Sequence, residues 1–364
     1  MLWLLLLVGV VLLAVLCLDV YATVFVPTGQ PGPVAGRLYH LTWRLWHRRF
    51  GDGSARSRRQ LAQLGPLLVP FTVLVWAALL WLGFTLVFLP WSPAESGFPG
   101  WFTALYVSGY SVTTLGTGDI TPSGRWPRAL MVLAAASGFV LISVAVTYLL
   151  SVYGALARMT ALAFEIHRFV GRDDGLVPAD VLVTVARADA ASELSDWLAS
   201  TASSLAEVVQ ADDEFPLLHY FHFPDERALP VALSDLLEVV TLCRTVLSPA
   251  AFPALTGGLV IAGTERIARS YFTALVRKFE GQPVDGERLM QERRAAFDTA
   301  WQTLSLAGVP LRAREEAWAR YDWERRTWDE ASARLRAGFG YPAFENGGPH
   351  PEAREGWSAF PRSR

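Results

Sequence analysis

The sequence is poor in charge and in cysteine, and each shortage narrows what the protein can be. Only 18% of the 364 residues are charged and 52% are hydrophobic, which excludes an ordinary soluble protein and leaves room for more than one domain. The two cysteines, Cys17 and Cys243, lie far apart, so we expect no disulfide framework. A formal net charge of −2 gives no sign of a nucleic-acid partner, and we expect none. No arrangement of nucleophile with acid or base is recognisable, so we do not expect an enzyme.

Three long apolar runs are present, at residues 2–26, 67–89 and 129–153. Each is close to or above the roughly 20 residues that a helix needs to cross about 30 Å of hydrocarbon. The first run has no basic residue before it and no small-x-small cleavage pattern, so we interpret it as an uncleaved helix and not as a secretion signal. The sequence therefore predicts an all-α membrane protein with three transmembrane helices.

The connection at residues 27–66 is strongly basic and predicts the orientation of the chain. It contains seven arginines and a single acid, Asp52. Because basic loops stay on the cytoplasmic side, we expect the N-terminus outside, residues 91–126 at the exterior, and the C-terminal part in the cytoplasm of a cell whose plasma or inner membrane holds the protein. The arginines are Arg37, Arg44, Arg48, Arg49, Arg56, Arg58 and Arg59.

Between the second and third runs lies a segment that predicts a re-entrant hairpin. Residues 101–112 form an amphipathic stretch of about three turns, too short to cross the membrane. A glycine-containing stretch, residues 113–119, follows, and its two glycines let successive carbonyl oxygens point toward one axis, where they can replace a cation's water shell. A segment that enters and returns is permitted at membrane depth where protein or a water-filled cavity satisfies its backbone. The alternative for Gly116 and Gly118 is an ordinary extracellular turn.

The run Thr114-Leu115-Gly116-Thr117-Gly118-Asp119 resembles the T-V-G-Y-G-D selectivity filter of the pore-loop potassium channel family, and the likeness extends over residues 67–153. The resemblance implies a homotetramer in which four filters meet on one axis. It assigns ion coordination to the carbonyls of Thr114, Leu115, Gly116 and Thr117, with the Thr114 hydroxyl as the innermost ligand and Asp119 at the outer mouth. It implies no cofactor, only K⁺ as the permeant ion.

Two residues depart from the family pattern and keep other functions open. Leu115 replaces the usual valine, and Thr117 replaces an aromatic residue, which favours a weakly selective cation channel as the alternative. Tyr110 stands where the family often has an acid; we expect Tyr110 and Thr113 to support the filter, with the Tyr110 phenol bonding near Thr117 or Asp119. A non-conducting signalling or scaffold protein with a pore-like loop is a third reading.

The third apolar run offers candidate gate residues. Gly138 stands where the family's inner helix commonly bends, although a glycine there serves equally for close packing of another helix. Residues on one helical face would line the pore and form an inner constriction; these are Phe139, Ile142, Val146, Thr147, Leu150 and Gly154. No series of arginines indicates a voltage sensor, and the sequence does not identify a regulatory ligand.

Two features near the first run concern the membrane surface. Asp19 lies near the inner end of that run, and we expect it to reach the cytoplasmic boundary or to pair with Arg37 or Arg44. The stretch at residues 29–63 mixes aromatic and leucine side chains with arginines, as is typical of a helix on the inner leaflet. Membrane lipid is therefore an expected partner, either as an anchor or as a regulator.

The chain is divided into a first transmembrane helix (1–26), a basic interfacial segment (27–66), a pore module (67–153), a helical cytoplasmic domain (154–337) and a flexible tail (338–364). No G-x-G-x-x-G follows a strand, so a nucleotide-binding domain is not indicated. The expected helices of the cytoplasmic domain are 178–210, 226–247, 254–280, 286–306 and 311–337.

Two clusters in the cytoplasmic domain have alternative interpretations. The first could bind a divalent ion through imidazoles and carboxylates, or its acids could simply cap helices; it comprises Asp212, Asp213, Glu214, His219, His222, Asp225 and Glu226. The second could be a seam between subunits or could pack within one subunit; it comprises Trp318, Tyr321, Arg325 and Trp328.

Overall fold

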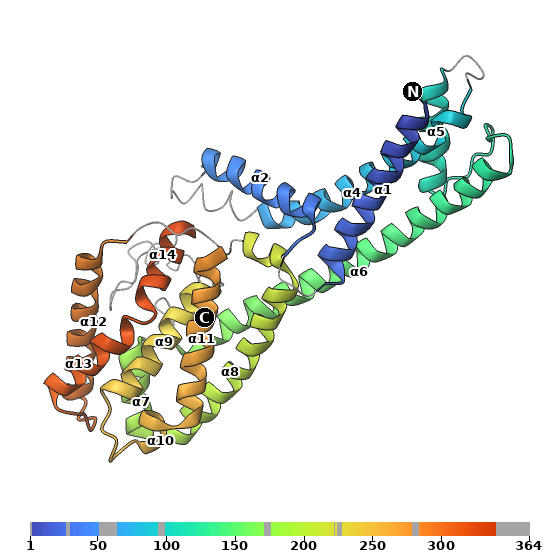
Figure 1. The fold of residues 1–364 in the computed structure, drawn as a ribbon. Helices are drawn as coiled ribbons and strands as arrows, with labels where there is room; N and C mark the ends of the chain where they lie inside the picture. Colours follow the sequence, from blue (N-terminus) through green and yellow to red (C-terminus); the bar gives the residue numbers. More distant parts are fainter. Residues whose placement is uncertain are drawn as a thin grey trace, which may run out of the picture. The chain divides into compact units, whose positions relative to one another are not determined.

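The computed structural model describes residues 2–26, 30–50, 64–93, 99–170, 176–221, 223, 228–278 and 284–339. In these ranges the chain is helical and contains no strand, only two isolated bridges (Figure 1). Three helices are long and apolar enough to cross a membrane, at Leu2–Val24, Leu64–Trp91 and Arg125–Phe169. The predicted all-α membrane fold is therefore confirmed. The contacts divide the chain into two compact units.

The first unit contains helices α1 (Leu2–Val24), α2 (Pro33–Phe50), α4 (Leu64–Phe88) and α5 (Gly100–Val112), together with the short η1 (Leu89–Trp91) and the part of α6 (Arg125–Phe169) up to Ala155. Helices α1 and α4 pack directly against each other (Figure 1). The two helices approach each other closely at Gly9 and Gly83, where a Cβ on Gly9 would lie 2.8 Å from the Gly83 carbonyl oxygen.

Asp19 is buried at the end of α1, and its partners differ from those we expected. Its Oδ1 accepts hydrogen bonds from the backbone N–H groups of Val34 (2.6 Å) and Ala35 (3.1 Å), at the start of α2. Its Oδ2 accepts one from Trp76 Nε1 of α4, at 2.7 Å. The pairing with Arg37 or Arg44 is therefore wrong. A helix start offers unpaired N–H groups and a partial positive charge, and these stabilise the carboxylate instead.

A short segment distant in sequence also belongs to the first unit. Residues Ala211–Phe221, which we placed in the cytoplasmic domain, pack against the transmembrane helices and include η2 (Pro216–Tyr220). The ring of Phe221 lies against Gly65 at the start of α4, where a Cβ would come within 2.6 Å of it. The ring of Phe215 lies 6.1 Å from that of Tyr148 on α6. Aromatic contacts thus decide the location of this segment.

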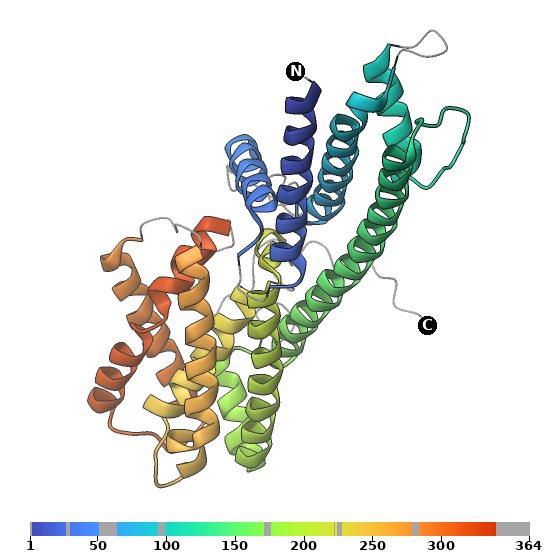
Figure 2. The same cartoon turned by 45° about the vertical axis from the view of Figure 1, so that its right-hand side comes forward.

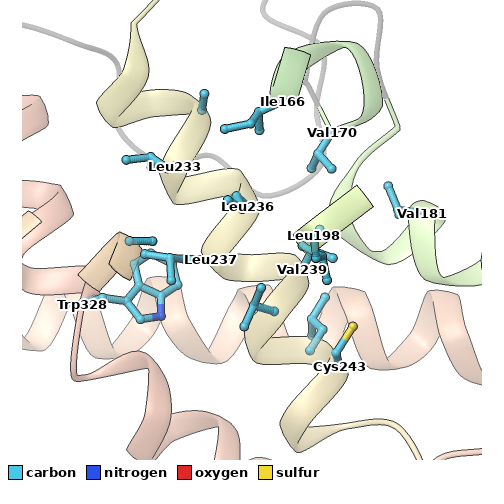
Figure 3. Close-up of a cluster of buried hydrophobic side chains, with 14 of the residues drawn as sticks. Ile166, Val170, Val181, Leu198, Leu233, Leu236, Leu237, Val239, Cys243 and Trp328 are labelled. Atoms are coloured by element: carbon cyan, nitrogen blue, oxygen red, sulfur yellow. The ribbon is translucent and has the colours of Figure 1, made fainter. Parts of the chain in front are cut away.

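The second unit contains the rest of α6, then α7 (Pro178–Ala188), α8 (Ala191–Glu214) as far as Gln210, α9 (Leu229–Thr245), α10 (Pro253–Gly257), α11 (Leu259–Lys278), α12 (Gly286–Leu306), α13 (Arg314–Arg325) and α14 (Asp329–Phe339). Helix α9 is buried along almost its whole length and forms the centre of the core. Figure 3 shows its side chains beside those from α6, α7, α8 and the turn before α14, which form one hydrophobic cluster; the labelled residues are Ile166, Val170, Val181, Leu198, Leu233, Leu236, Leu237, Val239, Cys243 and Trp328.

Several expected helices of this unit are interrupted. The helix expected at 178–210 is two helices, because Asp189 adopts a left-handed conformation (φ 52°) between them. The helix expected at 254–280 breaks at Gly258, and the one expected at 311–337 breaks after Arg325. The helix at 286–306 is confirmed with the same bounds.

The two clusters in the cytoplasmic part have different outcomes. In the second cluster, Tyr321, Arg325 and Trp328 are buried inside the chain, so it packs within one subunit. The possible metal cluster lies partly outside the described residues, which omit His222, Asp225, Glu226 and the side chain of His219. Among the residues that are described, no group of three or more His, Cys, Asp or Glu is placed to hold a metal ion.

Candidate functional site

Helix α5 is held against α4 by side chains that the two apolar helices direct at each other. Trp81 Nε1 donates to the Leu105 carbonyl oxygen at 2.9 Å, and the hydroxyls of Thr85 and Ser108 lie 2.7 Å apart. Gly109 gives the Trp81 ring room, since a Cβ there would lie 3.0 Å from Nε1. The helix begins at Gly100, after the extended residue Pro99, and ends at Val112. The first unit thus fixes both the direction and the end point of α5.

The loop that leaves α5 has an alternating backbone. Thr113 has φ −80°, and φ is then positive at Thr114 (56°), Gly116 (62°) and Gly118 (70°), but not at the residues between them. In an extended strand successive carbonyls point to opposite sides, and a backbone in which φ alternates in sign departs from that pattern, so that successive carbonyls can turn toward one side. Glycine adopts positive φ without strain, but Thr114 does so at a steric cost.

The N–H groups at the start of this loop point back to α5. Those of Thr113, Thr114 and Leu115 donate to the carbonyls of Gly109 (3.0 Å), Ser111 (3.0 Å) and Tyr110 (2.9 Å). These bonds satisfy the last carbonyls of the helix. Within the described part of the chain, the carbonyl oxygens of residues 113–118 accept no hydrogen bond. A row of oxygens remains available to an external ligand, and partially negative carbonyl oxygens favour a cation.

Tyr106 supports the end of the loop through its hydroxyl. Its hydroxyl lies 3.2 Å from Thr117 Oγ1 and 3.1 and 3.0 Å from the two carboxylate oxygens of Asp119. The hydrogen bond from Thr117, together with the one from Tyr106, lowers the pKa of the Asp119 carboxyl below its ordinary value. Asp119 therefore carries its negative charge at neutral pH.

Tyr110 has a separate partner on the returning chain. Its hydroxyl donates to the Ile120 carbonyl oxygen at 2.5 Å, and its ring packs on that of Tyr106 with the centroids 5.4 Å apart. Thr113 bonds back to the Gly109 carbonyl at 2.8 Å. The sequence contained a signal for Tyr106 that we did not use, since it lies one turn before Tyr110 and therefore on the same face of α5.

Helix α6 begins beside this loop and runs without interruption (Figure 2). Gly138 is buried against the end of α5, where a Cβ would overlap the Val112 carbonyl oxygen. The packing alternative therefore accounts for this glycine. The predicted gate residues Ile142, Val146 and Leu150 are 59%, 54% and 66% exposed in the single chain, so they lie on a face of α6 that the chain itself leaves uncovered.

Comparison with known proteins agrees with this geometry. Residues 71–154 match the model of a family described as ion channel. The chain is also similar to the uncharacterized membrane protein YdjJ of Bacillus subtilis (strain 168), with 26% identity over 243 residues, which cover 65% of this chain and 68% of that protein. No solved structure matches the chain. The matched segment, residues 71–154, runs from α4 through the alternating loop into α6 and is similar to the family described as ion channel.

Proposed function

We propose that four copies of this chain form a potassium channel in the cell membrane. The observation that carries the proposal is the alternating sign of φ at Thr114, Gly116 and Gly118, in a loop whose carbonyl oxygens accept no hydrogen bond within the described part of the chain. A single loop offers too few oxygens to replace the water around a cation, so several loops must meet on one axis. The uncovered face of α6 is free to face a central axis that the copies share.

The proposed path has three parts. Asp119, ionised and held by Tyr106, raises the cation concentration at the outer mouth. The carbonyls of residues 114–117 then replace the hydration shell. The negative C-terminal end of α5 points toward the inner end of the loop and stabilises a cation there. In this arrangement the N-terminus lies outside, the second unit lies in the cytoplasm, and the α6 face with Ile142, Val146 and Leu150 lines the inner passage.

A weakly selective cation channel is the second candidate, and Thr117 is the residue that favours it. A threonine side chain is shorter than an aromatic one and fills less of the space around the carbonyls. The Tyr106 hydroxyl reaches the Thr117 hydroxyl at 3.2 Å and replaces part of that support. Support at Thr117 therefore includes this hydrogen bond between the two side chains.

Ion flux from liposomes containing the purified protein tests the proposal. We expect K⁺ flux that exceeds Na⁺ flux, and we expect Gly116→Ala to abolish it because alanine is strained at φ 62°. Gly124→Ala is the matched control: Gly124 also has positive φ (108°) but lies beyond the filter. Equal K⁺ and Na⁺ permeability would indicate the weakly selective channel. Flux that is absent in every liposome would indicate a non-conducting protein.

A further inference from the structure

The face of α2 that points away from the first unit carries a row of arginines. Arg37, Arg44 and Arg48 are exposed at positions i, i+7 and i+11, which lie on one side of a helix. Leu41 and Leu45 beside them are 60% and 59% exposed. Residues 33–50 contain no acid, so no carboxylate within the helix offsets this charge. The row is a continuous basic and apolar surface.

The start of α2 is fixed at the end of a membrane-crossing helix. Gly32 N–H donates to Thr23 Oγ1 at 2.9 Å, and Asp19 accepts from the N–H groups of Val34 and Ala35. Thr23 is in the last turn of α1, and because α1 is long enough to cross the hydrocarbon, we expect the headgroups to begin near this residue. The opposite face of α2 is occupied, since Tyr39 is buried and its ring lies 5.7 Å from that of Tyr220. The arginine face is thereby held at headgroup depth.

The same carboxylate that holds α2 is connected to α6. Trp76 donates its indole N–H to Asp19 Oδ2, and the Trp76 ring lies 6.2 Å from that of Tyr148. Tyr148 is buried on α6, between the exposed positions Val146 and Leu150. All of these residues belong to the first unit. A shift of α2 therefore moves the buried carboxylate of Asp19. Because the other oxygen of this carboxylate accepts the Trp76 hydrogen bond, the shift also changes the position of the Trp76 ring against Tyr148 on α6.

We propose that the arginine face of α2 binds the phosphate groups of anionic phospholipids, and that Asp19, Trp76 and Tyr148 transmit this binding to α6. The second half rests on the proposed channel function. Phosphate recognition follows from the charge of the face, since guanidinium groups pair with phosphate oxygens in a bidentate manner. A membrane lipid is favoured over a soluble phosphate compound because Leu41 and Leu45 share the face, as is typical of helices that lie in the interface.

Lipid binding is tested first, without reference to conduction. The affinity of the purified full-length protein for dioctanoyl phosphatidylglycerol is measured in neutral detergent. Each arginine near an anionic surface contributes roughly fivefold in affinity, so we expect Arg37→Gln with Arg44→Gln to weaken binding about tenfold or more. The control is Arg187→Gln with Arg266→Gln, two exposed arginines of the second unit, and it should bind as the parent does. Equal loss in both double variants overturns the proposal, and so does competition by free glycerol phosphate at the same concentration.

Transmission to α6 is tested by flux from liposomes with and without phosphatidylglycerol. We expect the parent protein to respond to the anionic lipid and Trp76→Phe to lose the response while it binds the lipid normally. The phenyl ring retains packing on Tyr148 but cannot donate to Asp19. A Trp76→Phe protein that still responds overturns the transmission route. If the parent protein conducts in neither membrane, the proposed channel function is wrong. The lipid-binding measurement with the arginine variants then still tests whether the arginine face of α2 binds anionic lipid.

Discussion

The two units of this protein use their polar groups in opposite ways. In the first unit, the loop at residues 113–119 exposes all its residues and offers backbone carbonyls. In the second unit, charged side chains are buried and satisfy one another. Arg325 pairs with Glu238 at 3.0 Å, and Arg293 pairs with Asp322 and Asp329 at 2.6 and 2.8 Å.

The contrast indicates which unit is complete by itself. The second unit closes its core around α9 and matches its buried charges within the chain. The first unit leaves the carbonyls of its loop and one face of α6 uncovered. A buried polar group without a partner is costly, so in the channel that we propose the first unit requires other copies of itself, whereas the second unit is stabilised by its own contacts.

Removing one member of a buried ion pair should have the largest effect. Arg325→Met leaves Glu238 and the Tyr321 hydroxyl without their guanidinium partner, and we expect the second unit to lose about 3 to 5 kcal/mol. Hydrogen exchange of the α9 amides in the full-length protein measures the loss. The double variant Arg325→Met with Glu238→Leu should be more stable than Arg325→Met alone, because it removes the orphaned charge as well. A double variant that is less stable than the single one would contradict the idea that Arg325 and Glu238 compensate each other's buried charge.

The next largest effect is expected at Gly138, in the first unit. A Cβ there overlaps the Val112 carbonyl oxygen, so Gly138→Ala must push α6 away from α5, at a cost of about 1 to 3 kcal/mol. Thermal unfolding in detergent and the fraction of assembled oligomer should both fall. Gly263→Ala is the control, because Gly263 lies in α11 with no atom within 4 Å of its Cβ position. Alanine should stabilise that helix slightly. An unchanged oligomer in Gly138→Ala would show that the close approach is dispensable.

The sequence predicted the helical elements well where one physical signal dominated. The three membrane spans follow from length and apolar composition, and α12 has the bounds expected from the sequence, with Asp285 capping its first turn in the structure. The breaks at Asp189 and after Arg325 were missed because the residue types at both places also occur inside helices. Only contacts distant in sequence decide such positions.

The candidate site was predictable in its backbone but not in its side-chain partners. Gly116 and Gly118 indicated positive φ, whereas Thr114 carries no such signal and is also positive. We expected Tyr110 near Thr117, but the hydroxyl that reaches Thr117 is that of Tyr106. Which of the two tyrosines lies beside Thr117 depends on the path of the loop along α5, and residue types do not specify that path. Asp19 was misassigned because a helix start attracts a carboxylate without a basic side chain.

A smaller effect is expected from pH in the second unit. Burial raises the pKa of Glu324 from its usual 4.5 to about 7, although Arg244 opposes the rise. The folded state therefore binds a proton more tightly than the unfolded state, and the unit should be most stable below pH 4.5 with respect to this group. Stability should fall between about pH 4.5 and 7, by on the order of 2 kcal/mol. Glu324→Gln should flatten this slope in thermal unfolding of the full-length protein, and Glu316→Gln, at an exposed position, should not.

The smallest effect is expected from a single hydroxyl in the first unit. Tyr106→Phe removes the donor to Thr117 and Asp119 without changing the ring that packs on Tyr110. A neutral hydrogen bond contributes roughly 1 kcal/mol, so we expect the K⁺ to Na⁺ permeability ratio from bi-ionic reversal potentials to fall about fivefold. Tyr110→Phe, which frees only the Ile120 carbonyl, should change the ratio less. If Tyr110→Phe lowers the permeability ratio more than Tyr106→Phe does, the bond to the Ile120 carbonyl, and not the bond to Thr117, holds the carbonyl oxygens of the loop in place. Because the second unit contains neither residue, its hydrogen exchange should be unchanged in both variants, which separates a change in the filter from a change in the fold.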